Sequence, residues 1–356
     1  MMNVYNLIIV DESGSMGHLR QTTLSGINET IDTIRQSQKE FAETQRHYLT
    51  LVTFSSNHVN PAVRTLIDCK PIGEVAENFS DYMPQGCTPL YDAMGLSLVS
   101  LHERIKGNPE NAGVVTVLTD GLENASREWR ADGLRRLIDQ LKEEGWSFSY
   151  MGSAHNVKDV ADLLSIDNYI EFRHNHMGTS SSWAHERSSR RSLYCKMDMM
   201  SKTEPGLTHD EIIARKRQFA REYYGPRVTP AHIDSLEPNE VFVFGSNAAG
   251  FHAGGAAAQA MHHFGAIWGQ GEGLQGRSYA IPTMEGLDNM KAAIERFVLY
   301  ATEHKEQRFL VTRIGCGIAG YSAQQIAPLF SGCVSLENVT LPADFWDVLG
   351  LKMANM

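Results

Sequence analysis

Oxygen-bearing side chains follow the ends of two apolar runs in the sequence, and one more lies in a separate turn. The five of interest are Asp11, Ser13, Ser15, Thr88 and Asp120. Carboxylates and hydroxyls are hard donors, which suit Mg²⁺, Mn²⁺ or Ca²⁺ and suit zinc or copper poorly. In a parallel sheet, ligands collect at the carboxyl ends of the strands. The apolar runs 4–10 and 114–118 directly precede the two aspartates, so the sequence predicts a site for a hard divalent cation at that edge.

The order and spacing of these groups resemble a known family. An Asp-x-Ser-x-Ser motif, a threonine in a Gly-x-Thr-Pro-Leu turn and an Asp-Gly pair after a later strand resemble the von Willebrand factor type A (vWA) domain. The resemblance covers about residues 1–175 and includes the strand end at 148–152. It implies a Rossmann-like fold and a metal-ion-dependent adhesion site. In that family the serine and threonine hydroxyls coordinate the ion, and the aspartates contact it directly or through water. The implied ligands here are Asp11, Ser13, Ser15, Thr88 and Asp120.

The charges of this motif suggest how it would act. Two carboxylates balance a divalent charge, and three neutral hydroxyls leave the ion open to an incoming anionic oxygen. The resemblance therefore implies metal-dependent binding of a protein that presents an acidic side chain. In the alternative, a metal-free Rossmann-like domain, Ser13 and Ser15 only cap the following helix. No GxxxxGK[ST] phosphate loop is present, and Glu12 is expected to be exposed.

Glycine-rich loops follow two further apolar runs. Residues 241–257 read VFVFGSNAAGFHAGGAA, and residues 315–321 read GCGIAGY after the run 309–314. Glycine allows close backbone approach, and the N-terminus of a helix offers free N–H groups to phosphate. The spacing is not GxGxxG. Two such loops can hold a diphosphate from both sides, and a third glycine-rich stretch, 269–276, could order over a ligand.

This layout resembles the macro domain, a family that binds ADP-ribose, over about residues 235–356. Asn247 corresponds to the asparagine that contacts the distal ribose in that family. The resemblance implies ADP-ribose, a related nucleotide or an ADP-ribosylated protein as ligand. The implied contact positions are Gly245, Asn247, Gly250, Gly254, Gly255, Gly315, Cys316, Gly317, Ile318, Ala319, Gly320 and Tyr321.

Catalysis by this second region is an open alternative. The run 313–317 looks most like the macro-domain branch that removes ADP-ribose from acidic side chains. That branch uses an aspartate just after the second glycine, where this chain has Ile318 and Ala319, and a lysine, which first occurs here at Lys291. Asn247 and His252 could instead position or activate a water, which would make the protein an ADP-ribosyl hydrolase that uses its metal site for targeting.

Several other side chains near these loops have two interpretations. Cys316 is either a small packed thiol or a nucleophile activated by a helix N-terminus. Phe251, Trp268 and Tyr321 could stack on adenine or ribose, although aromatic side chains more often belong to a core.

Alternating strand and helix patterns must position both regions. Strands are expected at 4–10, 48–54, 113–119, 146–151, 240–244, 279–283, 308–314 and 339–341. Helices are expected around 24–34 and at 94–105, 134–144, 157–164, 255–264, 287–302 and 323–330. This alternation predicts βαβ units with parallel sheets, and the fold class is α/β, with two three-layer α/β/α domains.

The middle of the chain has a different composition. Residues 178–230 are rich in serine and charge, and the stretch 184–227 has a local net charge of +4. We expect a solvated connector that carries one helix, with a phosphate- or RNA-contacting patch as the alternative. The expected domains are therefore 1–200 (vWA), 201–234 (connector) and 235–356 (macro-like).

Composition excludes several classes of protein. The chain has 356 residues and a net charge of −10, which suits two globular domains and argues against nonspecific nucleic-acid binding. We find no apolar run of about 18 residues, and we expect the first ten residues not to be a signal peptide. Five cysteines without a CxxC pair argue against a disulfide framework and indicate a reducing, cytoplasmic setting. The expected function is that of an adaptor, of a kind typical of bacterial and phage proteins, that joins metal-dependent protein binding to ADP-ribose recognition.

Overall fold

The computed structural model describes residues 1–56, 62–224 and 227–352. Contacts divide the chain into two compact units, Met1–Tyr224 and Gly225–Met356. Among the described residues, none of the helices combines the length and the apolar character needed to cross a membrane. All five cysteines are free thiols.

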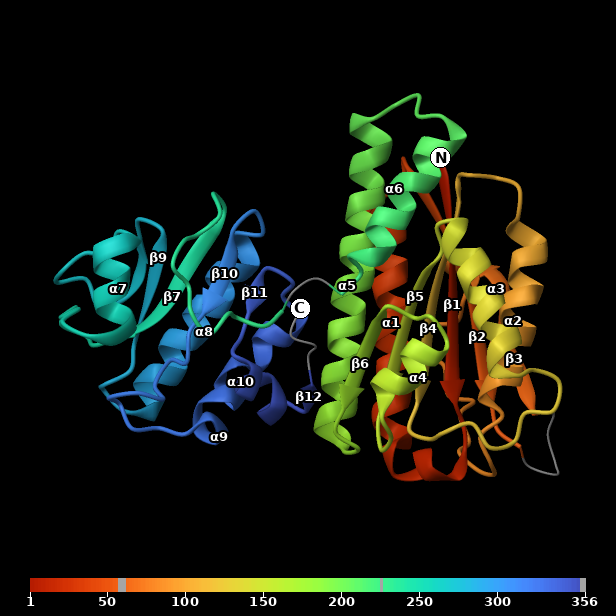
Figure 1. Ribbon diagram of the computed structural model, residues 1–356, viewed down its shortest axis with the longest axis horizontal. Coiled ribbons are helices and arrows are strands. Elements are labelled where there is room, and N and C mark those ends of the chain that lie inside the picture. The colour runs from red at the N-terminus through yellow and green to blue at the C-terminus, as the bar shows by residue number, and fades with distance from the viewer. Residues whose placement is uncertain (57–61, 225–226, 353–356) are drawn as a thin grey trace. The chain divides into compact units, whose positions relative to one another are not determined.

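Strands and helices alternate along the first unit (Figure 1). The strands are β1 (Met2–Asp11), β2 (Gln45–Phe54), β3 (Val63–Pro71), β4 (Asn111–Thr119), β5 (Ser147–Gly152) and β6 (Asn168–Phe172). The helices are α1 (Arg20–Glu40), α2 (Leu90–Ile105), α3 (Ala131–Glu143), α4 (Val157–Leu163), α5 (His176–Thr203) and α6 (His209–Arg221), with 3₁₀ turns at Gly14–Leu19 and Ile72–Glu74.

The sheet of the first unit brings the ends of β1 and β4 together. Its strand order is β6-β5-β4-β1-β2-β3. Strands β6, β5, β4, β1 and β2 run parallel, and β3 runs antiparallel to β2. Val10 of β1 is in register with Leu118 of β4. The residues that follow these two strands therefore meet at one edge, as parallel pairing predicts.

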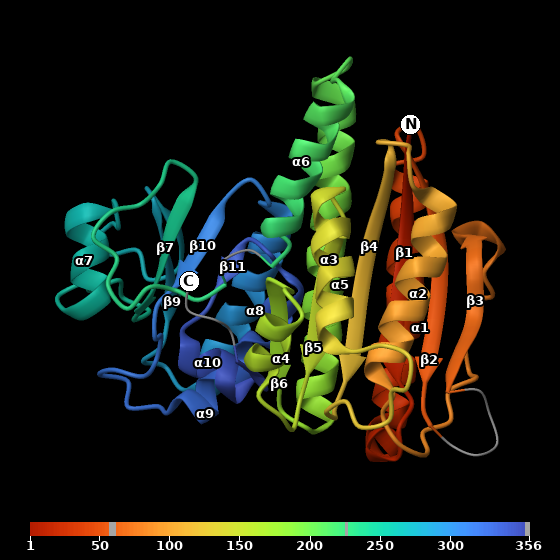
Figure 2. The same cartoon turned by 45° about the vertical axis from the view of Figure 1, so that its right-hand side comes forward.

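Helices cover both faces of this sheet, which gives three layers (Figures 1 and 2). Leu7 and Ile9 of β1 belong to a core that includes apolar residues of α2 and α3. The opposite face of β1 carries Asn6, which contacts α5, and α5 packs against α1. Because the central strands are buried on both faces, they read as nearly continuous apolar runs in the sequence.

Helix α5 overturns the expectation of a solvated connector after residue 178. Trp183 and Arg190 of α5 are fully buried, and Lys216 of α6 is 1% exposed. A Cβ added to Gly26 of α1 would lie 2.3 Å from the Trp183 ring, so the two helices meet closely there. The prediction was wrong because the buried face of α5 is largely polar and lacks an apolar period.

An ion pair occupies the interface between α5 and the sheet. Glu186 and Arg190 are both fully buried, with 2.9 Å between Arg190 Nη2 and Glu186 Oε1. Thr116 of β4 donates to Glu186 Oε1 at 2.7 Å, and Tyr223 donates to the same oxygen at 2.8 Å. Arg190 also donates to the side chain of Asn6 at 2.5 Å. This polar layer ties α5 to two central strands and to the end of the first unit.

Strand β3 forms the outer edge of the sheet next to β2. Its pairing with β2 is irregular, with register shifts on either side of Leu51. Cys69 has a φ of 47°, a left-handed conformation that is rare for residues other than glycine. The strand also carries Arg64, Asp68 and Lys70.

The second unit is a smaller α/β structure. Its strands are β7 (Glu240–Ser246), β8 (Gly273–Gln275), β9 (Ser278–Pro282), β10 (Arg308–Val311), β11 (Val339–Thr340) and β12 (Leu351–Lys352). Its helices are α7 (Gly255–His263), α8 (Leu287–Glu303), α9 (Ala323–Ile326) and α10 (Ala343–Val348), with a 3₁₀ segment at Ala327–Ser335.

The sheet of the second unit is mostly parallel as well. Its order is β11-β10-β7-β9-β8, and β8 runs antiparallel to β9. Phe242 and Phe244 of β7 share a core with Ala257 and Ala260 of α7. Helix α8 packs on the other face through Phe297, which lies edge-on to aromatic rings of β9 and β10. The loops after β7 and β10 leave the sheet at neighbouring positions, because these strands pair in parallel.

Candidate metal and nucleotide sites

Asp11 ends β1 and holds two neighbouring segments together. Its Oδ1 accepts a hydrogen bond from the Ser13 N–H at 2.7 Å, and its Oδ2 accepts one from the Thr119 hydroxyl at 2.5 Å. The carboxylate is fully buried. Burial raises the pKa of Asp11 to about 6, although the hydrogen bonds from Thr119 and Ser13 oppose this shift. Both oxygens are thus engaged, and Asp11 orients the loop that bears the serines.

The two serines and Asp120 form a short polar chain. Ser13 Oγ lies 3.1 Å from Ser15 Oγ, and Ser15 donates to Asp120 Oδ1 at 2.7 Å. Asp120 is 3% exposed, and its Oδ2 is buried and accepts no hydrogen bond from any described residue. Three of the five predicted ligands are therefore in contact at the β1 and β4 ends.

Thr88 reaches the same edge from a separate loop. Its N–H donates to Asn124 at 2.9 Å, and a Cβ built on Gly121 would lie 3.3 Å from Thr88 Oγ1. The Gly14 N–H donates to the Gly86 carbonyl at 3.0 Å, which joins this loop to the serine loop. All five predicted side chains thus belong to segments that touch at one edge of the sheet.

These donors fit a hard divalent cation. An orphaned, buried carboxylate oxygen is costly unless a cation or proton satisfies it, and Asp120 Oδ2 is such an atom. Within the described ranges, no group of three or more His, Cys, Asp or Glu side chains is placed to hold a metal. The hydroxyls of Ser13, Ser15 and Thr88 are the further oxygen donors at this edge, and oxygen donors of this kind match Mg²⁺, Mn²⁺ or Ca²⁺.

Two histidines that the sequence patterns did not reveal lie beside this edge. His174 Nε2 lies 3.4 Å from Asp120 Oδ2. The His174 ring stacks on His18 at 4.4 Å between centroids, and His18 Nδ1 lies 3.0 Å from the Ser15 carbonyl. Burial lowers the pKa of His174, whereas the charge of Asp120 opposes that shift. His174 follows β6, 54 residues beyond Asp120 in the chain, so no local spacing could have pointed to it.

Glu12 differs from its expected exposure. It is 1% exposed, its Oε1 accepts a hydrogen bond from the Met83 N–H, and Arg64 Nη1 lies 3.8 Å from its Oε2. The prediction failed because the loop at 82–85 folds over Glu12 and supplies its partners. Glu12 therefore fastens this loop beside the serines.

The first glycine-rich loop of the second unit is braced internally. The Asn247 side chain donates to the Phe251 carbonyl at 3.0 Å and accepts from the Phe251 N–H at 3.1 Å. Gly250 has a φ of 67°, and a Cβ there would lie 2.3 Å from the Gln270 nitrogen. A Cβ on Gly271 would meet the Asn247 carbonyl oxygen at the same distance of 2.3 Å. Glycines thus let the loops at 247–251 and 269–271 touch.

His252 and the aromatic residues of this region lie in contrasting settings. His252 is fully buried, its Nε2 lies 3.0 Å from Ser246 Oγ, and burial lowers its pKa. Phe251 and Trp268 are both more than half exposed, and their rings stack at 5.3 Å. The aromatic pair is thus a surface feature rather than part of the core.

The second glycine-rich loop follows β10 and is exposed at its tip. Gly315 has a φ of 75°, and the Tyr321 N–H closes the loop by donating to the Gly315 carbonyl at 3.0 Å. Ile318 is 89% exposed. Burial raises the pKa of the Cys316 thiol, which favours a packed thiol over an activated nucleophile.

Glu285 is a carboxylate near these loops that sequence reasoning missed. Its Oε1 accepts a hydrogen bond from the Ala248 N–H at 2.6 Å, and its Oε2 accepts one from the Met284 N–H at 3.1 Å. The loop after β9 thereby holds the loop after β7. Glu285 lies 37 residues beyond Ala248 in the chain, so its contact depends on the pairing of β7 with β9.

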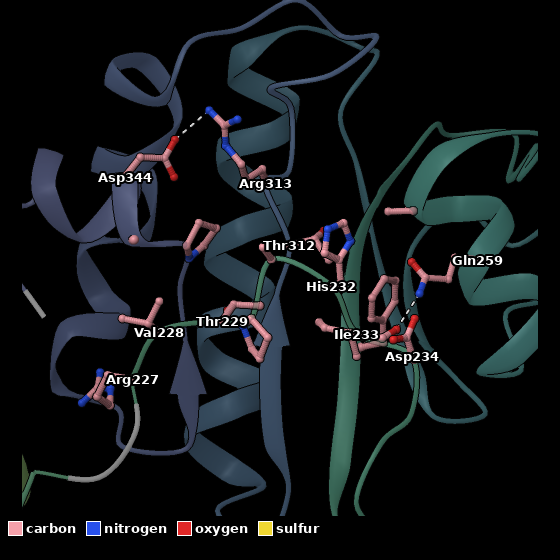
Figure 3. Close-up of a pocket in the computed structure, with 16 residues that line it drawn as sticks. Arg227, Val228, Thr229, His232, Ile233, Asp234, Gln259, Thr312, Arg313 and Asp344 are labelled. Carbon is pink, nitrogen blue, oxygen red and sulfur yellow. Dashed lines mark hydrogen bonds and ion pairs between the residues drawn. The ribbon is translucent and has the colours of Figure 1, made fainter. Parts of the chain in front are cut away.

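A cavity of about 900 Å³ lies between the segment 227–234, helix α7 and residues 312–313 (Figure 3). Its polar lining includes His232, Asp234, Gln259 and Thr312. Arg313 and Asp344, which also line it, form an ion pair at 2.7 Å. Cavities of about 300–1,000 Å³ accommodate small ligands and cofactors. The lining shares no residue with the predicted nucleotide contacts, although it borders both glycine loops along the chain.

Comparisons with known proteins give similarities of fold. No family model matches the sequence, and no curated protein matches it. The pilus adhesin SpaC from Lactobacillus rhamnosus GG, in its open conformation, matches with a TM-score of 0.43 and 12% identity, over 55% of this chain and 30% of SpaC. The SpRpn10 VWA domain matches with a TM-score of 0.37 and 10% identity, over 51% of this chain and 93% of that domain.

A third solved structure is the manganese-loaded TRAP protein of Plasmodium vivax. It matches with a TM-score of 0.33 and 17% identity, over 49% of this chain and 69% of TRAP. Each of the three similarities thus covers about half of this chain, and the chain spans less than a third of SpaC. At these identities and TM-scores they describe resemblance in fold alone.

Proposed function

We propose that the first unit is a vWA-type module that binds a protein partner through a divalent cation. The observation that carries this proposal is the contact of Ser13, Ser15 and Asp120, with a buried Asp120 oxygen left without a hydrogen bond. Its position at the carboxyl edge of a parallel sheet suits ligand binding.

Four side chains of the site would bind the ion, and a fifth orients the loop that carries two of them. Ser13, Ser15, Thr88 and Asp120 would hold the ion. Asp11 accepts from Ser13 and Thr119 and so fixes the serine loop relative to β4. A bound ion would supply an electrophilic centre for a carboxylate oxygen of the partner. The metal would thus allow an acidic partner to bind at a carboxylate-bearing edge of a chain with a net charge of −10.

Metal titration tests this proposal. We expect the full chain to bind Mn²⁺ with a stoichiometry near one, and Asp120→Ala to weaken binding at least tenfold, because the ion loses its charged ligand. Asp139→Ala, on the exposed part of α3, is the matched control and should bind as the wild type does. Equal affinity of the Asp120 and Asp139 variants by calorimetry would refute the assignment.

A peptide probe tests the partner class. An immobilised Asp-containing peptide should retain the Mn²⁺-loaded chain and release it on chelation, whereas the Asn-containing version should not retain it. Retention by both peptides alike would exclude recognition of a carboxylate.

We further propose that the second unit binds ADP-ribose or a related nucleotide through backbone N–H groups. The observation in favour is the pair of glycine loops at neighbouring strand ends. The cavity of about 900 Å³ borders these loops along the chain, although none of the predicted contact residues lines it. Binding without hydrolysis is favoured, because the two side chains that could activate a water are already engaged. The Asn247 amide bonds the Phe251 backbone, and His252 is buried against Ser246.

Titration of ADP-ribose into the full chain tests the nucleotide proposal. Gly317 has open space around a built Cβ, so Gly317→Val should fold normally, fill the loop and weaken binding at least tenfold. Gly73→Val, also in open space but in the first unit, should leave the affinity unchanged. If the wild type gives no heat of binding at millimolar ligand, ADP-ribose is excluded as its ligand. Steady release of ADP-ribose from a modified peptide would instead support the hydrolase alternative.

A further inference from the structure

The two oxygens of Asp120 lie in different environments. Oδ1 accepts a hydrogen bond from Ser15 at 2.7 Å. Oδ2 is buried and accepts no hydrogen bond from the described part of the chain, although His174 Nε2 lies 3.4 Å away. That Nε2 is itself buried and makes no hydrogen bond to a described residue. The His174 nitrogen and the Asp120 oxygen thus lie close together without a hydrogen bond between them.

The ring and the backbone of His174 are each held by a neighbouring segment. His18 stacks on it with an interplanar angle of 15°, and His18 in turn approaches the Ser15 carbonyl. The backbone beyond it is held by the N-cap of α5, where Asn175 accepts from the Gly178 N–H at 2.8 Å. A Cβ on Gly178 would lie 2.2 Å from the Arg173 carbonyl oxygen, so only glycine allows this tight entry into the helix.

The separation of the two donors suits ligands that share one ion. Donors bound at about 2.1 Å and at right angles lie about 3 Å apart. A hydrogen bond between the same atoms would be shorter and aligned. We propose that His174 is an additional ligand of the metal held by Asp120. The proposal rests on the metal site proposed above and adds a nitrogen donor to its oxygen set.

A nitrogen donor changes which ions the site prefers. Imidazole ligands suit transition ions, whose affinity for a site with nitrogen donors rises from Mn²⁺ through Co²⁺ to Ni²⁺, whereas Mg²⁺ and Ca²⁺ prefer oxygen donors. The oxygen motif alone suits Mg²⁺, Mn²⁺ and Ca²⁺ alike. With His174 included, the site prefers transition ions such as Mn²⁺ and Co²⁺ over Mg²⁺ and Ca²⁺. His18, which stacks on the His174 ring, is a positioning residue.

Pulsed electron paramagnetic resonance of the Mn²⁺-loaded full chain tests this inference directly. Nitrogen bonded to Mn²⁺ produces a ¹⁴N modulation of the echo. We expect this modulation in the wild type and its loss in His174→Ala. In competition titrations, the same variant should lose at least tenfold in Mn²⁺ affinity and less than threefold in Mg²⁺ affinity. Unchanged modulation in His174→Ala, or equal losses for both ions, would overturn the proposal.

Matched variants separate this inference from the metal site itself. His176→Ala removes a nearby histidine that bonds Thr22 and should keep the modulation. His174→Gln should lose it while melting at the wild-type temperature, which controls for misfolding of the alanine variant. If wild type binds no Mn²⁺ at millimolar concentration, the metal site fails. If wild type binds Mn²⁺ without ¹⁴N modulation, the metal site stands and the role of His174 is refuted.

Discussion

The buried pair of Glu186 and Arg190 shows how single residues hold α5 on the sheet. Arg190→Met leaves the Glu186 carboxylate buried without its cation, so we expect a loss of about 3–5 kcal/mol in the free energy of unfolding. The double variant Glu186→Gln/Arg190→Met removes both charges, while the glutamine carbonyl still accepts from Thr116 and Tyr223. It should recover much of that loss in urea unfolding. A double variant as unstable as the single one would contradict this explanation.

His47 makes the first unit sensitive to acid. It is buried, and burial, with the charge of Arg190, lowers its pKa to about 3. The unfolded chain takes up this proton near pH 6.5 and the folded chain only near pH 3. Unfolding therefore binds a proton in this window, and stability falls as the pH is lowered from about 6.5 to 3.

Substitution of His47 isolates this effect. The contribution of one such group reaches about 1.4 kcal/mol per pH unit, so His47→Phe should flatten the dependence of unfolding free energy on pH between 6 and 4. Urea unfolding at several pH values gives the comparison. Parallel curves for the variant and wild type would show that His47 does not set the acid response.

The candidate metal residues were predictable from sequence to different degrees. Ser13, Ser15 and Asp120 follow strand-like apolar runs, and parallel pairing of β1 with β4 brings them into contact. His174 was not predictable, because its proximity to Asp120 depends on the path from β6 into α5. Glu285 was missed for a similar reason, since only the β7–β9 pairing brings it to Ala248.

The close approach of α1 and α5 can be tested at the level of the helix interface. A Cβ on Gly26 would overlap the ring of Trp183. Gly26→Ala should therefore cost about 1–3 kcal/mol through overpacking, even though alanine favours a helix. Gly133 of α3 meets only an ordinary contact at 3.9 Å from Trp129, so Gly133→Ala should stabilise the protein by about 0.5–1 kcal/mol. Thermal unfolding that moves in the same direction for both variants would refute the packing argument.

Elements with one clear hydrophobic pattern were predictable, and elements that depend on tertiary partners were not. The core strands β1, β2 and β4 and the helices α2, α3 and α8 lie where apolar periodicity indicates. Strand β3 is half-exposed and irregular, and β6 is short, so neither has a strong period. Helix α5 buries polar groups that satisfy one another, which a polar sequence pattern cannot distinguish from a solvated segment.

The extent of each unit leads to a prediction for the whole molecule. Contacts place the division after Tyr224, later than the expected domain end at 200. Fragment 1–224 should unfold in one cooperative transition. Fragment 1–200 lacks α6 and the Tyr223 hydroxyl that bonds Glu186, so it should melt at least 10 °C lower or aggregate. Circular dichroism and limited proteolysis measure both. Equal melting temperatures would place the boundary at the earlier position.

The outer strand of the first sheet bears on how the protein behaves at high concentration. An edge strand offers free backbone groups that can recruit another molecule into a continuing sheet. In β3 the register shifts beside Leu51 and the left-handed Cys69 interrupt the regular spacing of those groups. Arg64, Asp68 and Lys70 add charge along the same strand. An incoming strand would thus meet an interrupted ladder that carries charged side chains, and both features disfavour growth of the sheet into intermolecular fibrils.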